Sequence, residues 1–215
     1  MTGDPQARLE ALGPIPAVVP VVTISDGVDA MSLARALCRG GLDVIEVVLR
    51  TPAALRAIER IAAEVPEARV GAGTVTSPEQ VSAARRVGAT FLVLPGSPGR
   101  LVDAALDSGL AVLPAASTVT EMMTLAERGF RTLKFFPAEA VGGVRLLSAV
   151  GAPLPGLRFC PTGGVSVANA RDYLALPNVP FVGGSWVCPG DALRDGDWAR
   201  VEALAAEAAS LSPGT

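Results

Sequence analysis

Short apolar runs rich in Val, Ile and Ala alternate along the chain with longer segments in which apolar residues recur every three or four positions. The first pattern predicts buried β-strands and the second predicts amphipathic helices. Strands are predicted at Ala17–Ile24, Val44–Arg50, Arg69–Val75, Phe91–Gly96, Ala111–Ser117, Thr132–Pro137, Arg158–Gly163 and Phe181–Trp186. Helices are predicted at Val28–Arg39, Pro52–Glu64, Pro78–Val87, Arg100–Asp107, Val119–Arg128, Val144–Val150, Val167–Leu174 and Trp198–Ser210, with a short helix at Gln6–Leu12 before the first strand.

Eight strands, each followed by a helix, predict an α/β fold of the (β/α)8 TIM barrel type with a short N-terminal helix. No linker or shift of composition divides the chain, so we expect one domain over residues 1–215. The alternative is a doubly wound open sheet, which usually has fewer strands. The dinucleotide-binding GxGxxG motif is absent, because its nearest match, Gly71-Ala-Gly-Thr74, lies on a predicted strand.

Composition and charge exclude several classes of protein. Half of the 215 residues are hydrophobic, yet no apolar run reaches the roughly 18 residues of a membrane helix. The net charge of −3 gives no electrostatic footprint for nucleic acid. The first residues, Met1-Thr-Gly-Asp-Pro-Gln, lack the basic and apolar regions of a signal peptide. We therefore expect a soluble, cytoplasmic protein with no nucleic-acid or membrane partner.

Two residue types are conspicuously scarce. The chain has no His, which excludes Ser–His and Cys–His catalysis and His-ligated metal sites. Its three cysteines are far apart in sequence and have no His beside them, so we expect free thiols and no metal site. We also expect no cofactor. Of the 18 basic residues, Lys134 is the single lysine. Arg cannot lose its proton in a protein, so Lys134 is the one side chain able to act as an amine nucleophile.

Lys134 lies in the predicted sixth strand. Leu133 and Phe135 suit the layer under the helices, so Lys134 and Phe136 are expected to point into the barrel. Burial in an apolar interior penalises the charged ammonium and favours the neutral amine. The neutral amine is the nucleophile that Schiff-base chemistry requires. The alternative is that one lysine remains by chance in an Arg-rich chain.

The second strand carries a carboxylate and a guanidinium on the same predicted face. Large apolar residues at positions 45, 47 and 49 favour the helix-facing layer, which turns Glu46 and Arg50 inward. They are about 13 Å apart along an extended strand, with Arg50 at the carboxyl rim. A buried carboxylate in an apolar barrel is costly unless the protein uses it. The alternative is a structural ion pair with a neighbouring strand.

Glycine clusters end the last two predicted strands, and each is followed by a predicted helix. They are Pro161-Thr-Gly-Gly164 and Gly183-Gly-Ser-Trp186. Loops after strands 7 and 8 often bind phosphate in this fold, because Gly lets backbone amides approach the anion. The hydroxyls of Thr162 and Ser185 would add to Gly163, Gly164 and Gly184. The alternative is that these glycines only permit tight turns.

Thr74 is expected at the end of the third strand, on the same inward face as Val70 and Ala72. There it can help Arg50 to bind a carboxylate. In contrast, the stretch Ser117-Thr-Val-Thr-Glu121 is most simply a helix capping box.

Six segments, in order and with matching spacing, resemble the KDPG aldolase family of 2-dehydro-3-deoxy-phosphogluconate and 4-hydroxy-2-oxoglutarate aldolases. The similarity extends from about Val19 to the last helix. The segments are Glu46-Val-Val-Leu-Arg-Thr51, Gly71-Ala-Gly-Thr-Val75, Ser117-Thr-Val119, Lys134-Phe-Phe-Pro-Ala-Glu139, Arg158-Phe-Cys-Pro-Thr-Gly-Gly164 and Gly183-Gly-Ser-Trp186.

The resemblance implies a metal-independent class I aldolase that cleaves a phosphorylated 2-oxo sugar acid to pyruvate and glyceraldehyde 3-phosphate. It implies that Lys134 forms the Schiff base and that Glu46 transfers protons through a water molecule. Arg50 and Thr74 would hold the pyruvate carboxylate, and Gly163, Gly164 and Ser185 the phosphate. The same resemblance places Pro95 and Phe136 in the pocket and implies a homotrimer.

Two segments depart from the family pattern at the expected catalytic rim. Leu94 precedes Pro95 where a small or polar residue is expected, and Ala115-Ala116 stands where a glycine is expected. Other functions considered are a galactonate-series aldolase, cleavage of 4-hydroxy-2-oxoglutarate to pyruvate and glyoxylate, and a non-catalytic phosphate-binding barrel. A metal-dependent phosphosugar epimerase would need His ligands, which the chain lacks.

Overall fold

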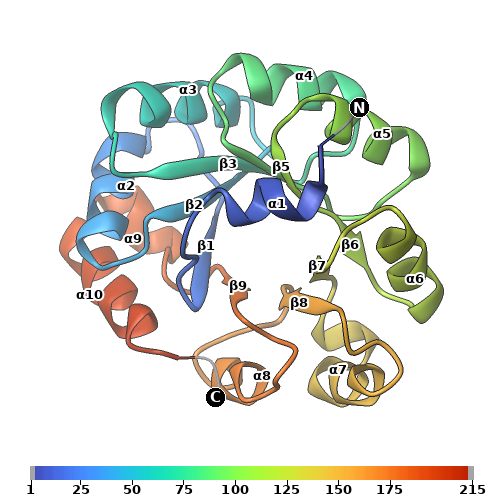
Figure 1. Cartoon of the computed structure of the whole chain (residues 1–215). Coiled ribbons are helices and arrows are strands. Elements are labelled where there is room, and N and C mark those ends of the chain that lie inside the picture. The colour runs from blue at the N-terminus through green and yellow to red at the C-terminus, as the bar shows by residue number, and fades with distance from the viewer. Residues whose placement is uncertain (1–2, 213–215) are drawn as a thin grey trace.

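The computed structural model describes residues 3–212 and shows an α/β fold in which helices surround curled parallel sheets (Figure 1). Every predicted strand is present, although most are shorter than predicted. The strands are β1 (Val18–Val22), β2 (Val44–Val48), β3 (Arg69–Gly73), β4 (Phe91–Val93), β5 (Ala111–Leu113), β6 (Ala115–Ala116), β7 (Thr132–Phe135), β8 (Arg158–Pro161) and β9 (Val182–Gly184).

The helices also follow the sequence pattern, with one addition, α9, that the periodicity did not predict. They are α1 (Pro5–Glu10), α2 (Ala30–Arg39), α3 (Ala54–Glu64), α4 (Pro78–Arg86), α5 (Gly99–Asp107), α6 (Val119–Glu127), α7 (Gly143–Gly151), α8 (Ala170–Leu174), α9 (Gly190–Asp195) and α10 (Trp198–Ala209), with a 3-10 turn at Glu139–Val141. The predicted capping box is confirmed, because Thr118 accepts from the amide of Glu121, whose carboxylate accepts from the amide of Thr118.

All paired strands are parallel and lie in two hydrogen-bonded sheets. Six strands follow the order β5-β4-β3-β2-β1-β9, and the other three follow the order β6-β7-β8. The chain passes from the first sheet to the second at Pro114, whose carbonyl accepts from the amide of Lys134. Within residues 3–212, no ladder of backbone hydrogen bonds joins β8 to β9. The described sheets therefore form an open, curled arrangement, and the closed eight-stranded barrel predicted from sequence is not shown by the pairing.

Side chains on the two faces of the strands belong to two separate apolar clusters. Ile45, Val47, Leu133 and Phe135 pack outward against the helices. Val44 faces the interior with other residues near the beginnings of the strands. This alternation confirms the predicted faces of β2 and β7. Leu92 and Leu94 also belong to the outer cluster, whereas Phe91 and Val93 belong to the interior one.

The predicted parity of β3 is wrong. Val70 and Ala72 belong to the outer cluster, so Gly71 and Gly73 face the interior. The interior beside these two glycines has no room for a side chain. A Cβ atom on Gly71 would collide with the ring of Phe91, and one on Gly73 would collide with the carboxylate of Glu46. The glycines of this strand therefore make room for larger side chains from its neighbours.

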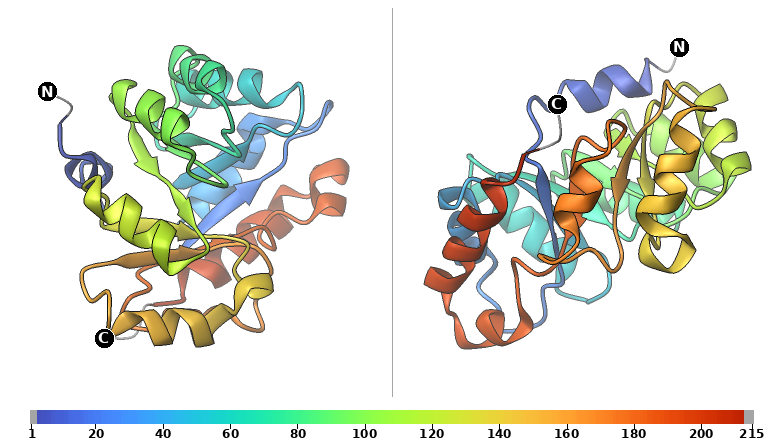
Figure 2. Two further views of the ribbon diagram at one scale, coloured as in Figure 1. Left: turned by 90° about the vertical axis from the view of Figure 1, so that its right-hand side faces the viewer. Right: turned by 90° about the horizontal axis from the view of Figure 1, so that it is seen from below.

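Helix α1 lies across the end of the sheet where the strands begin (Figures 1 and 2). Leu9, Leu12 and Ile15 pack against the interior cluster at that end. Arg69 holds the segment between α1 and β1 against the sheet. It pairs with Asp43 at 2.6 Å and donates to the carbonyl of Leu12 at 2.5 Å. Apolar side chains of this N-terminal segment thus cover part of the base of the sheet.

In the described part of the chain, no helix combines the length and the apolar character that crossing a bilayer would require.

Candidate active site

The buried charges of the interior meet at one point. Lys134 Nζ donates a hydrogen bond to Glu46 Oε1 at 3.2 Å, and both residues are less than 5% exposed. They come from different sheets, Glu46 from β2 and Lys134 from β7. Each charge supplies the partner that burial of the other requires. Glu46 is therefore ion-paired, but its partner is the single lysine in the other sheet and not a residue of a neighbouring strand, as the alternative from sequence had it.

Gly73 and the ring of Phe136 lie beside this pair. Gly73 leaves the space that the Glu46 carboxylate fills. The ring of Phe136 lies beside the lysine, with its centroid 5.5 Å from Nζ, a cation–π distance. Ser117 donates to the carbonyl of Phe136 at 2.6 Å and so ties the end of β6 to the end of β7. Gly73 and Ser117 were not assigned a role in the site from sequence, although both lie in the segments that carry the family resemblance.

Cys160 lies directly beside Lys134, because the two residues are register partners in β8 and β7. Burial raises the pKa of the Cys160 thiol to about 12. The thiol therefore stays protonated at neutral pH. Lys134 and Glu46 are then the candidate reactive groups of this part of the interior.

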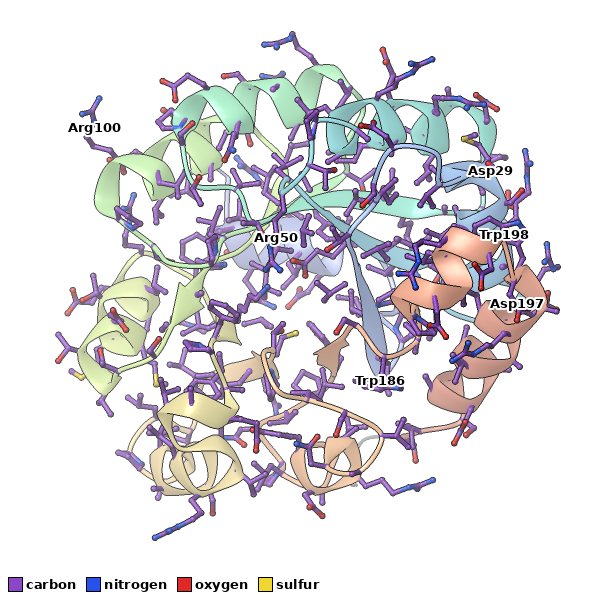
Figure 3. All side chains as sticks on the ribbon, turned by 180° about the vertical axis from the view of Figure 1, so that it is seen from behind. Asp29, Arg50, Arg100, Trp186, Asp197 and Trp198 are labelled. Atoms are coloured by element: carbon purple, nitrogen blue, oxygen red, sulfur yellow. The ribbon has the colours of Figure 1, made fainter. Side chains whose placement is uncertain are left out.

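Arg50 lies beyond the end of β2 rather than within it. The strand ends at Val48, and the amide of Arg50 donates back to the carbonyl of Val48 at 2.8 Å in a tight turn. The predicted strand end at Arg50 is therefore wrong, although Arg50 does lie at the rim. In Figure 3 it is near the centre of the ring of strands, whereas Arg100 and Trp198 are at the periphery.

Thr74 positions the Arg50 side chain. Arg50 Nε donates to Thr74 Oγ1 at 3.1 Å, and within residues 3–212 its two terminal nitrogens have no protein partner. Thr74 has a φ of 54°, the one positive value among the described non-glycine residues. Such a conformation costs a β-branched residue about 1–3 kcal/mol. Arg50 thus presents a fork suited to a carboxylate, held by a strained neighbour.

The loop after β8 exposes backbone amides. Gly163 and Gly164 have φ values of 93° and 83°, which favour glycine. In the described part of the chain, the amides of Gly163, Gly164 and Val165 donate to no protein acceptor. Consecutive unpaired backbone amides are the groups from which anion-binding sites are commonly built. Neither glycine cluster leads directly into a helix, since α8 begins at Ala170, and α9, which was not predicted, begins at Gly190.

The other residues predicted to bind phosphate differ in how far they are buried. Ser185 is exposed, directly after buried Gly184, on which the ring of Trp186 lies. Thr162 is buried, and its hydroxyl lies 3.8 Å from the Cys160 thiol. The structure brings Ser185 to the surface and keeps the Thr162 hydroxyl in the interior.

The two departures from the family pattern differ in their surroundings. Leu94 is fully buried in the outer cluster and faces the helices, not the interior. Ala115 is the register partner of Lys134 in β6, and Ala116 packs in the outer cluster. Pro95 is half-buried beyond the end of β4. Of the two departures, only Ala115 therefore lies next to the reactive amine.

Within the residues that the structure describes, no three His, Cys, Asp or Glu side chains are grouped so as to hold a metal ion. The expectation that the protein needs neither metal nor cofactor stays a prediction.

Comparison with known proteins gives consistent matches over nearly the whole chain. A model of the KDPG and KHG aldolase family matches residues 13–204. The 2-dehydro-3-deoxy-phosphogluconate aldolase of Pseudoalteromonas atlantica is 48% identical over 197 residues, which are 92% of this chain and 92% of that protein. The KHG/KDPG aldolase of Escherichia coli K12 is 49% identical over 89% of this chain and 90% of its own length.

A solved structure extends the likeness to the fold. The KDPG aldolase of Legionella pneumophila, with pyruvate captured as a covalent carbinolamine, superposes with a TM-score of 0.88 at 39% identity. The match covers 91% of this chain and 95% of that one. These matches and the family model agree, and the chain belongs to the KDPG and KHG aldolase family.

Proposed function

We propose that this protein is a class I aldolase that cleaves 2-dehydro-3-deoxy-6-phosphogluconate (KDPG) to pyruvate and glyceraldehyde 3-phosphate. The observation that carries the proposal is the buried contact between the single lysine, Lys134, and the Glu46 carboxylate at 3.2 Å. Lyases of this class need an amine that can become neutral and a group that moves protons beside it. The relatives named above carry the same activity in their names.

The first step forms a bond between the amine and the substrate. A proton leaves the Lys134 ammonium along its hydrogen bond to Glu46, and the neutral amine attacks the C2 carbonyl of the 2-oxo acid. Glu46 returns that proton to the hydroxyl of the resulting carbinolamine, which leaves as water and gives an iminium ion linked to Nζ, and Glu46 is again a carboxylate. The covalent carbinolamine captured in the Legionella relative is the corresponding species of that enzyme.

Cleavage uses the iminium ion as an electron sink. The C4 hydroxyl gives its proton to Glu46, the C3–C4 bond breaks, and the released aldehyde leaves an enamine on Lys134. Glu46, acting through a water molecule, then returns a proton to C3, and hydrolysis of the iminium ion frees pyruvate and the amine. General acid–base catalysis by one carboxylate in this way typically contributes about 10²–10⁴-fold.

Further residues orient the substrate at its two ends. Arg50 offers its free terminal nitrogens to the pyruvate carboxylate, and Thr74 holds the guanidinium from the side. Phe136 borders the amine, and Pro95 lies at the end of β4 on the same rim. At the other end, the unpaired amides of residues 163–165, together with Gly184 and Ser185, take the phosphate.

The alternatives are weaker on the same observations. A non-catalytic phosphate-binding barrel has no use for a buried lysine paired with a buried carboxylate, because such a pair costs desolvation without serving the ligand. The relatives named above are gluconate-series enzymes, which does not favour a galactonate-series activity. Cleavage of 4-hydroxy-2-oxoglutarate remains a second substrate class, since the Escherichia coli relative is named for both.

The test is trapping with pyruvate and sodium borohydride, followed by intact mass. Lys134 and the amino terminus are the two primary amines of the chain, so a Lys134→Arg control isolates the site. We expect one reduced pyruvate adduct in the wild-type protein and none at this site in the variant. An equal adduct in both proteins would remove the Schiff-base mechanism. Release of glyceraldehyde 3-phosphate from KDPG, measured by a coupled assay, then tests the substrate.

The closed eight-stranded barrel also belongs to the proposal. β5 and β6 are two parts of one strand interrupted at Pro114, and a Cβ on Gly183 of β9 would collide with Thr162 at the end of β8. These contacts support closure between β8 and β9, and a crystal structure without hydrogen bonds there would contradict it. The homotrimer and the cytoplasmic location rest on the resemblance and the sequence, and sedimentation and cell fractionation test them.

A further inference from the structure

Residues 162–166 form the loop after β8 to which the proposed function assigns the substrate phosphate, and we call it the phosphate loop. It is held by groups that lie on the side opposite to its unpaired amides. Three consecutive carbonyls of the loop each accept a hydrogen bond from the protein. Thr162 accepts from the amide of Ala138 at 2.8 Å, and Gly163 accepts from the amide of Glu139 at 3.1 Å. Gly164 accepts from Asn169 Nδ2 at 3.1 Å.

These three anchors determine where the next three amides point. In a planar trans peptide the C=O and the N–H point in opposite directions. Fixing the carbonyls of residues 162–164 therefore fixes the amides of residues 163–165, and it turns them away from the anchors. Asn169 also accepts from the amide of Ser166 at 2.8 Å, so its side chain secures the end of the loop.

Glu139 supports the loop a second time, through its side chain. A Cβ atom placed on Gly164 would lie 2.5 Å from Glu139 Cγ, so the glutamate stem is in contact with the backbone of Gly164. The carboxylate accepts a hydrogen bond from the hydroxyl of Tyr173 on α8. Tyr173 is fully buried. The loop is thus linked through Glu139 to a residue of the core.

We propose that Glu139, Asn169 and Tyr173 are positioning residues that keep loop 162–166 in the shape that binds the substrate phosphate. This proposal rests on the proposed function and deepens it. A backbone anion site works only if its dipoles are already oriented, and two glycines with positive φ make this loop costly to order. The three side chains supply that order in advance and touch no substrate themselves.

The geometry also indicates what each side chain contributes. The Glu139 carboxylate lies on the anchor side of the loop, where it serves as a hydrogen-bond acceptor and a packing stem. A glutamine can do both, so the charge itself is not required. The Tyr173 hydroxyl and the Asn169 amide act as donors, and Phe and Ala at those positions remove the donor.

The test compares a phosphorylated substrate with pyruvate, which has no phosphate. The variants are Tyr173→Phe, Asn169→Ala, Glu139→Ala and the conservative Glu139→Gln, with Asp172→Asn on the exposed face of α8 as a matched control. KM and kcat are measured with KDPG, competitive inhibition is measured with inorganic phosphate, and the imine at Lys134 is trapped with pyruvate and borohydride.

We expect KM for KDPG to rise about 3- to 10-fold in the first three variants, with a matching loss of inhibition by inorganic phosphate. Imine trapping should stay within about 2-fold of wild type, and Glu139→Gln and Asp172→Asn should resemble wild type in every readout. A thermal melt of each variant confirms that it is folded.

Three results would overturn the inference. Unchanged KM in Tyr173→Phe and Asn169→Ala would show that the loop keeps its shape without these donors. A parallel loss of imine trapping would show general damage instead of a defect at the phosphate end. A defect in Glu139→Gln as large as in Glu139→Ala would make the charge the essential feature. Failure of the proposed function is distinguishable, because wild-type protein itself would then trap no pyruvate at Lys134.

Discussion

The two ends of the candidate site are built in opposite ways. At the proposed pyruvate end, charged side chains from two sheets meet directly, with Lys134 against Glu46, and Arg50 donates to Thr74 at the rim. At the proposed phosphate end, a loop offers backbone amides, and the side chain of Asn169 donates to the carbonyl of Gly164 behind it. In the proposed mechanism the first end performs the covalent chemistry, and this chemistry needs titratable groups. The second binds an anion that does not react, and oriented amides suffice for that task.

Because of this difference, we expect substitutions at the two ends to change different kinetic constants. A substitution at the pyruvate end removes a reacting group and lowers kcat, whatever substrate is used. A substitution at the phosphate end changes the shape of a loop, so it should raise KM only for substrates that carry a phosphate. Each of the following predictions separates these two outcomes.

The largest effect is expected for Glu46→Gln, which keeps the shape of the side chain and removes its ability to take a proton. We expect kcat with KDPG to fall by about 10²–10⁴-fold. Trapping of pyruvate should also slow, since the amine loses the acceptor of its proton. Glu64→Gln, in an exposed pair with Arg60, is the matched control and should leave activity unchanged. Retention of wild-type kcat in Glu46→Gln would exclude Glu46 as the proton-transfer group.

A smaller effect is expected when a methyl group is added to a glycine at either end. In Gly73→Ala the new methyl group displaces the Glu46 carboxylate, and a displacement of about 1 Å can cost up to about 100-fold in kcat. Gly164→Ala should instead raise KM for KDPG and spare pyruvate trapping, because its neighbour is Glu139.

Gly156→Ala provides the control for both glycine variants. No heavy atom lies within 4 Å of a Cβ at that position, and its φ is outside the left-handed region. Equal effects of Gly73→Ala and Gly164→Ala on pyruvate trapping would contradict the division of the site into two ends.

The smallest effect is spectroscopic and concerns the support of the phosphate loop. Burial, followed by the hydrogen bond to Glu139, raises the pKa of the Tyr173 phenol well above its usual 10.0. Tyr173 is the single tyrosine, so phenolate absorbance reports on it alone. We expect no phenolate in the folded protein at pH 10.0, and its appearance at higher pH together with unfolding.

The sign of the accompanying stability change follows from proton binding. Above pH 10.0 the unfolded chain releases the phenol proton and the folded chain keeps it, so stability is full below this pH and falls as the pH rises. Tyr173→Phe should lose less stability between neutral and alkaline pH than wild type does. Ordinary titration of the phenol in the folded protein would show that Tyr173 is not held against Glu139.

The pyruvate end could largely be predicted from sequence because its residues are chemically unusual. A single lysine among arginines and a carboxylate within an apolar strand stand out in any reading of the chain. Strand alternation then placed both correctly inside, since β2 and β7 keep the regular period of two.

The support of the phosphate loop could not be predicted in the same way. Glu139 and Tyr173 are 34 residues apart, and nothing in either local pattern indicates that they meet. Thr74 was assigned by parity, but the interior positions of β3 are glycines and the chain at Thr74 adopts a positive φ, where alternation no longer applies. Tertiary contact and backbone strain decide such positions, and neither is visible in periodicity.

Helix α1 has a kinetic consequence. Because α1 and the segment that follows it pack Leu9, Leu12 and Ile15 against the base of the strands, we expect substrate, water and products to pass through the carboxyl end. The water that hydrolyses the iminium ion on Lys134 must therefore arrive by the route that the aldehyde uses to depart. In the proposed mechanism pyruvate stays bonded to Lys134 as the enamine when the aldehyde is released, so the phosphorylated aldehyde leaves first and pyruvate last. Pyruvate should accordingly act as a competitive inhibitor of cleavage, and the aldehyde as a non-competitive one.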